Sequence, residues 1–224
     1  MCLRGILRSF ALATVLAFAC LPAKAADESL FGSSEVRSNN ISSFTNWTGV
    51  LNRYHAMAEL GEGLCATAAG GVSYRHESCA WDKWEHILDE YKGESQMEQL
   101  RGVNDTFNSV RYVEDSNNWG RQDYWETVFE FLDRNAGDCE DYAISKYVTL
   151  RKLGWPADRL RIVIVRDTKL DLNHAILAAY TDDGVYIGDN QVRGLVKASS
   201  IHHYRPIYSI NENGWWLHRA RKSD

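Results

Sequence analysis

The spacing of apolar residues changes from helical to strand-like at Gly154 and Pro156, and this change most limits the possible fold. Helical spacing predicts helices over 47–64, 81–91, 95–112, 124–132 and 138–153, with polar loops at 65–79 and 113–123. Strands are predicted over 160–165, 174–180, 185–189, 204–210 and 215–218. The order predicts an α+β fold, with a helical N-terminal part packed on an antiparallel sheet.

The first 25 residues have the features of a cleavable signal peptide. Arg4 and Arg8 precede the apolar run Phe10 to Leu21, which is too short to cross a bilayer, and Ala23-Lys24-Ala25 has the pattern of a cleavage site. A buried N-terminal helix and lipidation at Cys20 are the alternatives. We therefore expect export to the periplasm, with a signal peptide at 1–25, an N-terminal arm at 26–46 and one domain at 47–224.

Charge and cysteine content constrain partners and redox state. Cleavage after Ala25 would take the net charge from −5 to −8, which argues against nucleic acid or an anionic membrane as a partner. The mature chain would keep three cysteines, Cys65, Cys79 and Cys139. In an oxidising compartment we expect a Cys65–Cys79 bridge and a free thiol at Cys139, with two reduced cysteines as the alternative.

Three residues on consecutive predicted elements suggest nucleophilic catalysis. Cys139 lies in the first turn of a helix, where the helix dipole stabilises a thiolate. His174 and Asp189 lie on two strands joined by a tight turn, so they are expected to meet across the hairpin. This order matches nucleophile, base and orienting acid. A small buried cysteine and a structural histidine are the alternatives.

The predicted nucleophile is surrounded by acidic residues. Asp138, Glu140 and Asp141 would raise the pKa of the Cys139 thiol, so an active enzyme would need a neutralising cation or a basic partner. Calcium accepts irregular shells of oxygen ligands, and Asn118 and Asp123 in the preceding loop are candidates to complete one. The alternative is that these acids only cap the helix.

The segment around Cys139 resembles a known family. The motif is Gly137-Asp138-Cys139-Glu140-Asp141-Tyr142, supported by Asp123-Tyr124-Trp125, Asn173-His174, Asp189-Asn190 and the segment Tyr204 to Ser209. It resembles the bacterial transglutaminase-like cysteine proteinases of the LapG type, over roughly residues 75 to 217. Gly188 departs from the pattern, because a larger apolar residue is expected before Asp189.

The resemblance implies a transglutaminase-like (papain-like) fold and a Cys139–His174–Asp189 triad. It implies a calcium-dependent periplasmic protease, with Asp138, Glu140 and Asp141 as ligands. Such proteases cut the N-terminal region of a large repeat adhesin within a dialanine motif, which frees the adhesin and promotes biofilm dispersal. The periplasmic domain of an inner-membrane cyclic-di-GMP receptor holds them inactive.

Two other functions fit the same residues. A transglutaminase would use the same triad but transfer the acyl group to an amine, and incorporation of a labelled amine would identify it. A non-catalytic peptide-binding domain could also have this fold, although such a domain would be expected to lose the cysteine or the histidine.

Overall fold

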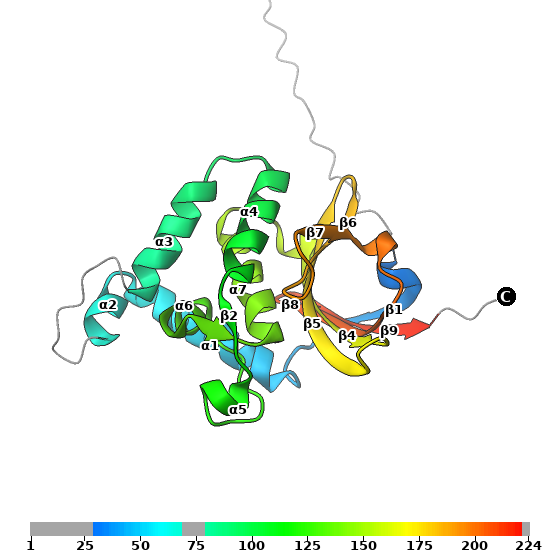
Figure 1. Ribbon diagram of the computed structural model, residues 1–224, viewed down its shortest axis with the longest axis horizontal. Helices are drawn as coiled ribbons and strands as arrows, with labels where there is room; N and C mark the ends of the chain where they lie inside the picture. The colour runs from blue at the N-terminus through cyan, green and yellow to red at the C-terminus, as the bar shows by residue number, and fades with distance from the viewer. Residues whose placement is uncertain (1–28, 69–78, 221–224) are drawn as a thin grey trace, which may run out of the picture.

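The computed structural model describes residues 29–68 and 79–220 of the chain (Figure 1). Helices lie on one side of the molecule, and a strongly curved sheet lies on the other. The predicted α+β class, with helices packed on an antiparallel sheet, is confirmed. The predicted signal peptide at 1–25 lies outside the described residues. None of the helices within the described ranges has the length and apolarity needed to cross a membrane.

Most helices lie close to their predicted positions. The seven α-helices of the described residues are α1 (Thr45–Leu60), α2 (Gly63–Ala68), α3 (Ala80–Tyr91), α4 (Gln96–Asn108), α5 (Asp115–Asn118), α6 (Val128–Arg134) and α7 (Cys139–Lys152). The prediction for 124–132 began too early, because Thr127 and Glu130 form a capping box that starts α6 at Val128. The loops predicted over 65–79 and 113–123 contain the end of α2 and the single turn α5.

Seven strands form the main sheet, and every neighbouring pair is antiparallel. In sheet order they are β1 (Ser33–Ser38), β9 (Gly214–Ala220), β8 (Tyr204–Asn211), β4 (Leu160–Asp167), β5 (Leu172–Thr181), β6 (Gly184–Gly188) and β7 (Leu195–Lys197). The two edge strands, β1 and β7, were not predicted. The segment expected to be a loosely packed arm therefore contains β1, which pairs with β9. Its polar sequence hides this pairing, because several of its side chains face solvent.

Helix α7 is the central helix of the molecule. It contacts α4 and α6 on one side and β4 and β5 on the other, so it lies between the helical layer and the sheet (Figure 1). Every residue from Asp141 to Leu150 is buried as a result. Trp84 of α3 fixes this packing by donating from Nε1 to Thr149 Oγ1 at 2.9 Å. Because both of its sides are covered, α7 gives its first residue, Cys139, a fixed place beside the sheet.

The cysteines are arranged as predicted. A disulfide joins Cys65 in α2 to Cys79, the residue before α3. Cys139 is a free thiol. The bridge therefore connects two peripheral helices and leaves the thiol at the start of α7 available for chemistry.

Candidate active site

The backbone before Cys139 is held by a short parallel strand pair. β3 (Ala136–Gly137) pairs with β2 (Arg111–Tyr112), and this brings the loop after α4 beside the start of α7. A Cβ atom at Gly137 would lie 2.6 Å from Phe131 and 2.8 Å from Asp141 Oδ2, so only glycine fits here. Asp138 is the N-cap residue, and its backbone N–H donates to Asp141 Oδ2 at 3.0 Å. Cys139 therefore occupies the first position of the helix, as predicted.

His174 and Asp189 meet across the β5–β6 hairpin, as their spacing predicted. β5 and β6 are antiparallel with Leu177 opposite Gly188, which places Asp189 just past the end of β6. His174 Nε2 lies 2.8 Å from Asp189 Oδ1, and both side chains are 1% exposed. A water-excluded contact of this kind fixes the imidazole ring in one orientation.

The Asp189 carboxylate is fully occupied by hydrogen bonds. Its Oδ1 also accepts from the Gln191 backbone N–H at 2.8 Å, and its Oδ2 accepts from Tyr204 Oη at 2.6 Å. Burial alone would raise the pKa of Asp189, but the hydrogen bond and charge of His174 and the two other donors hold that pKa below its usual value. Asp189 is thus an ionised partner for His174.

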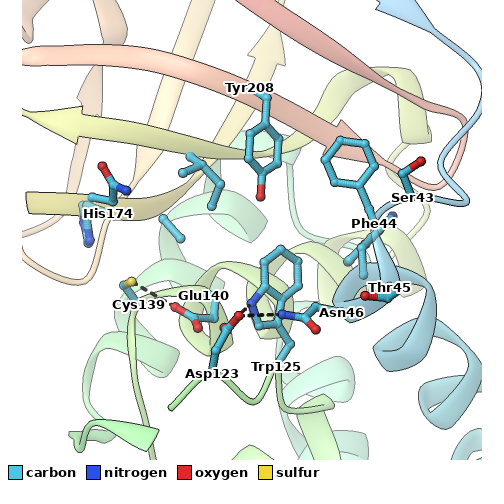
Figure 2. Close-up of a pocket in the computed structure, with 14 residues that line it drawn as sticks. Ser43, Phe44, Thr45, Asn46, Asp123, Trp125, Cys139, Glu140, His174 and Tyr208 are labelled. Atoms are coloured by element: carbon cyan, nitrogen blue, oxygen red, sulfur yellow. Dashed lines mark hydrogen bonds between the residues drawn. The ribbon is translucent and has the colours of Figure 1, made fainter.

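Cys139 and His174 line the same pocket, which has a volume of about 590 Å³ (Figure 2). The helical wall of the pocket carries Cys139, Glu140, Asp123 and Trp125. The sheet wall and the start of α1 complete the lining with Ile164, Asn173, His174, Ala175, Tyr208 and residues 43–47. The pocket is therefore a cleft between the two layers of the fold, with a thiol and an imidazole at one end.

The thiol of Cys139 points at an acid in this structure. Its Sγ donates to Glu140 Oε2 at 3.1 Å, whereas no hydrogen bond joins it to His174 among the described residues (Figure 2). Burial, and then the charge and hydrogen bond of Glu140, raise the pKa of the Cys139 thiol, while the Ala175 backbone N–H partly offsets this effect. The acids therefore oppose thiolate formation, as the sequence predicted.

The acids form a larger cluster than the sequence predicted. Ligand-competent oxygens or sulfur lie within 4.8 Å of one another in three overlapping groups: Asp138–Cys139–Glu140, Asp115–Asp123–Glu140 and Asp115–Glu126–Asp141. Burial is the main cause that raises the pKa of Asp115 to about 6 and those of Asp138 and Glu126 to about 8. Asp115 Oδ1, Glu126 Oε2 and Asp138 Oδ1 are buried without a hydrogen-bond partner. Such orphaned oxygens are costly unless a cation or proton occupies the space between them.

The suggested ligands take different positions around this cluster. Asp123 lies close to Glu140, as expected for a shared ion. Asn118 instead donates from Nδ2 to Glu126 Oε1 at 2.6 Å, so its amide contacts the cluster as a hydrogen-bond donor. Asp141 is completely buried, and its two oxygens accept from the backbone N–H groups of Glu126 and Asp138. Its observed contacts therefore stabilise the loop before α7.

Two acids of the cluster were missed by sequence reasoning. Asp115 and Glu126 lie 24 and 13 residues before Cys139, Asp115 in the segment predicted as a polar loop and Glu126 in the segment predicted as a helix. The pairing of β2 with β3 and the hydrogen bond from the Glu126 backbone N–H to Asp141 Oδ1 bring these residues to the start of α7. The Tyr124 backbone N–H donates to Asp115 Oδ2, which holds the segment in a closed loop. No feature of the sequence alone indicates this contact.

Comparison with known proteins places these features in a family. Residues 73–222 match the family model described as bacterial transglutaminase-like cysteine proteinase. The solved structure of Legionella pneumophila LapG is 33% identical, with a TM-score of 0.59, and the match covers 67% of this chain and 84% of that chain. Its calcium-bound form matches at 32% identity and TM-score 0.59, over 68% of this chain and 85% of that chain. An EGTA-treated form matches at 33% identity and a TM-score of 0.60, and the match covers 70% of this chain and 85% of that chain. No curated protein matches the sequence.

Proposed function

This chain belongs to the bacterial transglutaminase-like cysteine proteinases, and on that basis we propose that Cys139, His174 and Asp189 form its catalytic triad. The observation that carries the proposal is the buried His174–Asp189 pair, which opens on the same pocket as a free thiol at a helix N-terminus. A structural histidine has no need of a pocket, and a structural cysteine has no need of a helix dipole.

The geometry assigns a role to each nitrogen of His174. Nε2 donates its hydrogen to the ionised Asp189 carboxylate, so Nδ1 carries the lone pair and acts as the base. Nδ1 has one weak neighbour, Gln191 Nε2 at 3.4 Å. Rotation of the Cys139 side chain away from Glu140 would bring its thiol toward Nδ1, because both residues line one end of the pocket.

These roles account for peptide hydrolysis. His174 takes the thiol proton of Cys139, and the thiolate attacks the carbonyl carbon of the scissile bond. The imidazolium then gives its proton to the leaving amine as the C–N bond breaks, which leaves a thioester on Cys139. His174 next removes a proton from water, the resulting hydroxide attacks the thioester, and the proton returns to the Cys139 sulfur as the acid leaves.

We further propose that the acidic cluster holds calcium. The orphaned, buried oxygens of Asp115 and Asp138, together with Glu140 and Asp123, supply the oxygen ligands that calcium prefers in an irregular shell. Bound calcium would neutralise the acids and lower the pKa of the Cys139 thiol. Glu140 would then turn its oxygens to the ion, and the Cys139 thiol would be free to donate to His174. The calcium-bound form of the LapG relative supports this choice of ion.

The resemblance to the LapG type extends the proposal to the substrate and its control. The proposed substrate is the N-terminal region of a large repeat adhesin, cut at a dialanine-type site, so that the adhesin is released and the biofilm disperses. The proposed location is the periplasm, after removal of residues 1–25. The periplasmic domain of an inner-membrane cyclic-di-GMP receptor is the proposed inhibitor.

A cleavage experiment tests this function. The purified chain would be incubated with N-terminal fragments of the largest repeat adhesin of the same genome, in calcium or in excess EGTA, and products would be mapped by mass spectrometry. A matched control is the same fragment with its alanine pairs changed to Asp-Asp. One calcium-dependent cut that the control lacks supports the proposal. Absence of any cut in calcium, or cutting that is equal in the control, contradicts the proposed substrate.

A further inference from the structure

Helix α7 carries a second unusual residue besides Cys139. Lys146 lies two helical turns after Cys139, and its side chain is completely buried. Its Nζ donates to Asn108 Oδ1 at 2.6 Å. Asn108 is the last residue of α4, so this bond joins the nucleophile's helix to a neighbouring helix. A buried lysine is costly, because its amine must leave water, and the proposed mechanism gives it no role.

The bond from Lys146 continues to the triad. Asn108 uses its other amide atom, Nδ2, to donate to the backbone carbonyl oxygen of Asp189 at 2.8 Å. The amide of Asn108 is therefore oriented at both ends, by the amine on one side and the carbonyl on the other. The chain of contacts runs from α7, through α4, to the residue that holds His174.

The surroundings of Lys146 favour this arrangement over a chance contact. Gly188, the residue before Asp189, leaves space here, because a Cβ atom at that position would lie 3.1 Å from Asn104 Oδ1 and 3.7 Å from Lys146 Cδ. The departure from the family pattern noted at Gly188 thus has a physical reason. The lysine faces the charges of Asp189 and Asp105 and lies 5.9 Å from the ring of Tyr142.

The bond does not depend on the charge of the lysine. Burial lowers the pKa of Lys146 to about 7, against the attraction of Asp189 and Asp105. Both the ammonium and the neutral amine carry N–H groups, so Lys146 can donate to Asn108 in either state. A fixed distance between α7 and Asp189 is therefore maintained across neutral pH.

We propose that Lys146 is a positioning residue that acts through Asn108 and sets Asp189 and His174 in register with Cys139. The proposal rests on the triad proposed above. Cys139 lies at the start of α7. Lys146, on the same helix, is connected through Asn108 to the backbone carbonyl of Asp189, whose carboxylate holds His174. Without these two hydrogen bonds, Asp189 would keep the hydrogen bonds of its carboxylate but would lose its fixed distance from α7.

The pH dependence of Cys139 alkylation tests the proposal without a substrate. Iodoacetamide would be reacted with the full chain in saturating calcium at pH 6 and pH 9, with modification of Cys139 followed by peptide mass spectrometry. A thiolate paired with imidazolium reacts at pH 6, whereas an unpaired thiol reacts well only at pH 9. The ratio of the two rates therefore measures the pairing and cancels changes in access to the thiol.

The variants separate positioning from a general structural role. Lys146→Met keeps the buried length and removes the donor, and it should lower stability because Asn108 Oδ1 is left without a partner. Asn108→Ala breaks the same chain of contacts, and the double variant tests whether the two residues act together. Lys152→Met is the matched control, because Lys152 is an exposed lysine on the same helix. Urea unfolding midpoints would show that each variant is folded.

We expect the pH 6 to pH 9 ratio to fall at least tenfold in Lys146→Met and in Asn108→Ala, with no further fall in the double variant. Lys152→Met should stay within twofold of the wild type. A folded Lys146→Met with a wild-type ratio overturns the proposal, and if that variant does not fold, a wild-type ratio in Asn108→Ala does so. Equal ratios for the wild type and His174→Ala would instead contradict the triad.

Discussion

Tyr204 donates from Oη to Asp189 Oδ2 at 2.6 Å, on the carboxylate oxygen that His174 does not contact. Tyr204 is the first residue of β8, and the His174–Asp189 pair belongs to the β5–β6 hairpin. The sheet therefore holds the carboxylate from a strand outside the hairpin. This contact fixes the plane of the Asp189 carboxylate, and through it the ring of His174.

Removing this donor should slow catalysis without abolishing it. We expect Tyr204→Phe to lower kcat/KM by about tenfold, or about 1.4 kcal/mol, because one hydrogen bond to a buried charge is lost. Asp189→Asn should cost far more, up to about 10⁴-fold, since the orientation and charge of the base are both lost. Steady-state cleavage of an adhesin fragment provides the measurement. The control is Tyr186→Phe, which removes a similar bond to the exposed Asp183. Equal activity in Tyr204→Phe and wild type would refute a role for this contact.

The sequence predicted the positions of the three proposed triad residues better than it predicted the acidic cluster. Cys139, His174 and Asp189 each lie at the end of a regular element or close to it, and such ends can be located from hydrophobic spacing and turn residues. The contact between His174 and Asp189 followed from the geometry of one hairpin. Local patterns were enough for this part of the site.

Contacts between distant segments could not be predicted in the same way. Asp115 joins the cluster because β2 pairs with β3, and two-residue strands leave no periodic signal. β1 pairs with β9 across most of the chain, and its sequence is polar because it lies at a sheet edge. Lys146 was expected to lie on a helix, but its burial depends on the packing of α4 and on the absence of a side chain at Gly188. Each of these features depends on tertiary packing.

Calcium should bind through Asp138 and Glu140, which the sequence suggested, and also through Asp115, which it did not. We expect Asp138→Asn, Glu140→Gln and Asp115→Asn each to weaken calcium binding at least tenfold, because each removes charge from the buried cluster. Calcium at 100 times its Kd should stabilise the wild type by about 2.7 kcal/mol. Isothermal titration calorimetry and urea unfolding, with and without EGTA, measure both effects.

Asp133→Asn is the matched control for these variants, because Asp133 is an exposed acid on α6, outside the cluster. It should bind calcium like the wild type. Wild-type affinity in Asp115→Asn would remove Asp115 from the shell. Identical unfolding midpoints in calcium and EGTA, at millimolar calcium, would contradict the calcium site as a whole.

Stability without calcium should fall as the pH rises from 5 to 7. Five acids have raised pKa values: the buried Asp115, Glu126 and Asp141, and the partly buried Asp138 and Glu140. In the unfolded chain they ionise near pH 4, so in this range the folded state binds more protons, and the free energy of unfolding decreases with pH. Burial lowers the pKa of His218 to about 4, so this one residue makes the free energy of unfolding rise with pH over the same range. The five acids outweigh it. The window ends at pH 7, above which Lys146 also opposes the trend.

Urea midpoints at pH 5, 6 and 7 measure this trend in EGTA and in calcium. Calcium should flatten it, because bound calcium keeps the acids ionised in the folded state. A midpoint that rises with pH in EGTA would show that the acids are not buried together as described.

The disulfide should affect stability but not activity. Cys65 and Cys79 are separated by 14 positions, and closing a loop of about 15 residues contributes up to about 3 kcal/mol in the chain-entropy model. Neither residue lines the pocket that contains Cys139 and His174. We therefore expect Cys65→Ser/Cys79→Ser to lower the free energy of unfolding by up to that amount and to keep cleavage within twofold. A large loss of activity in a folded variant would mean that the bridge also shapes the active site.

A cleavage assay of the Cys139→Ala variant is the most direct test of Cys139 as the nucleophile. The first residue of α7 would remain a small side chain at a helix start, so the fold and the calcium-dependent rise in urea midpoint should match the wild type. We expect no detectable product from an adhesin N-terminal fragment in saturating calcium, under conditions where the wild type cuts it completely. Cleavage by folded Cys139→Ala at the wild-type rate would contradict the assignment of Cys139 as the nucleophile.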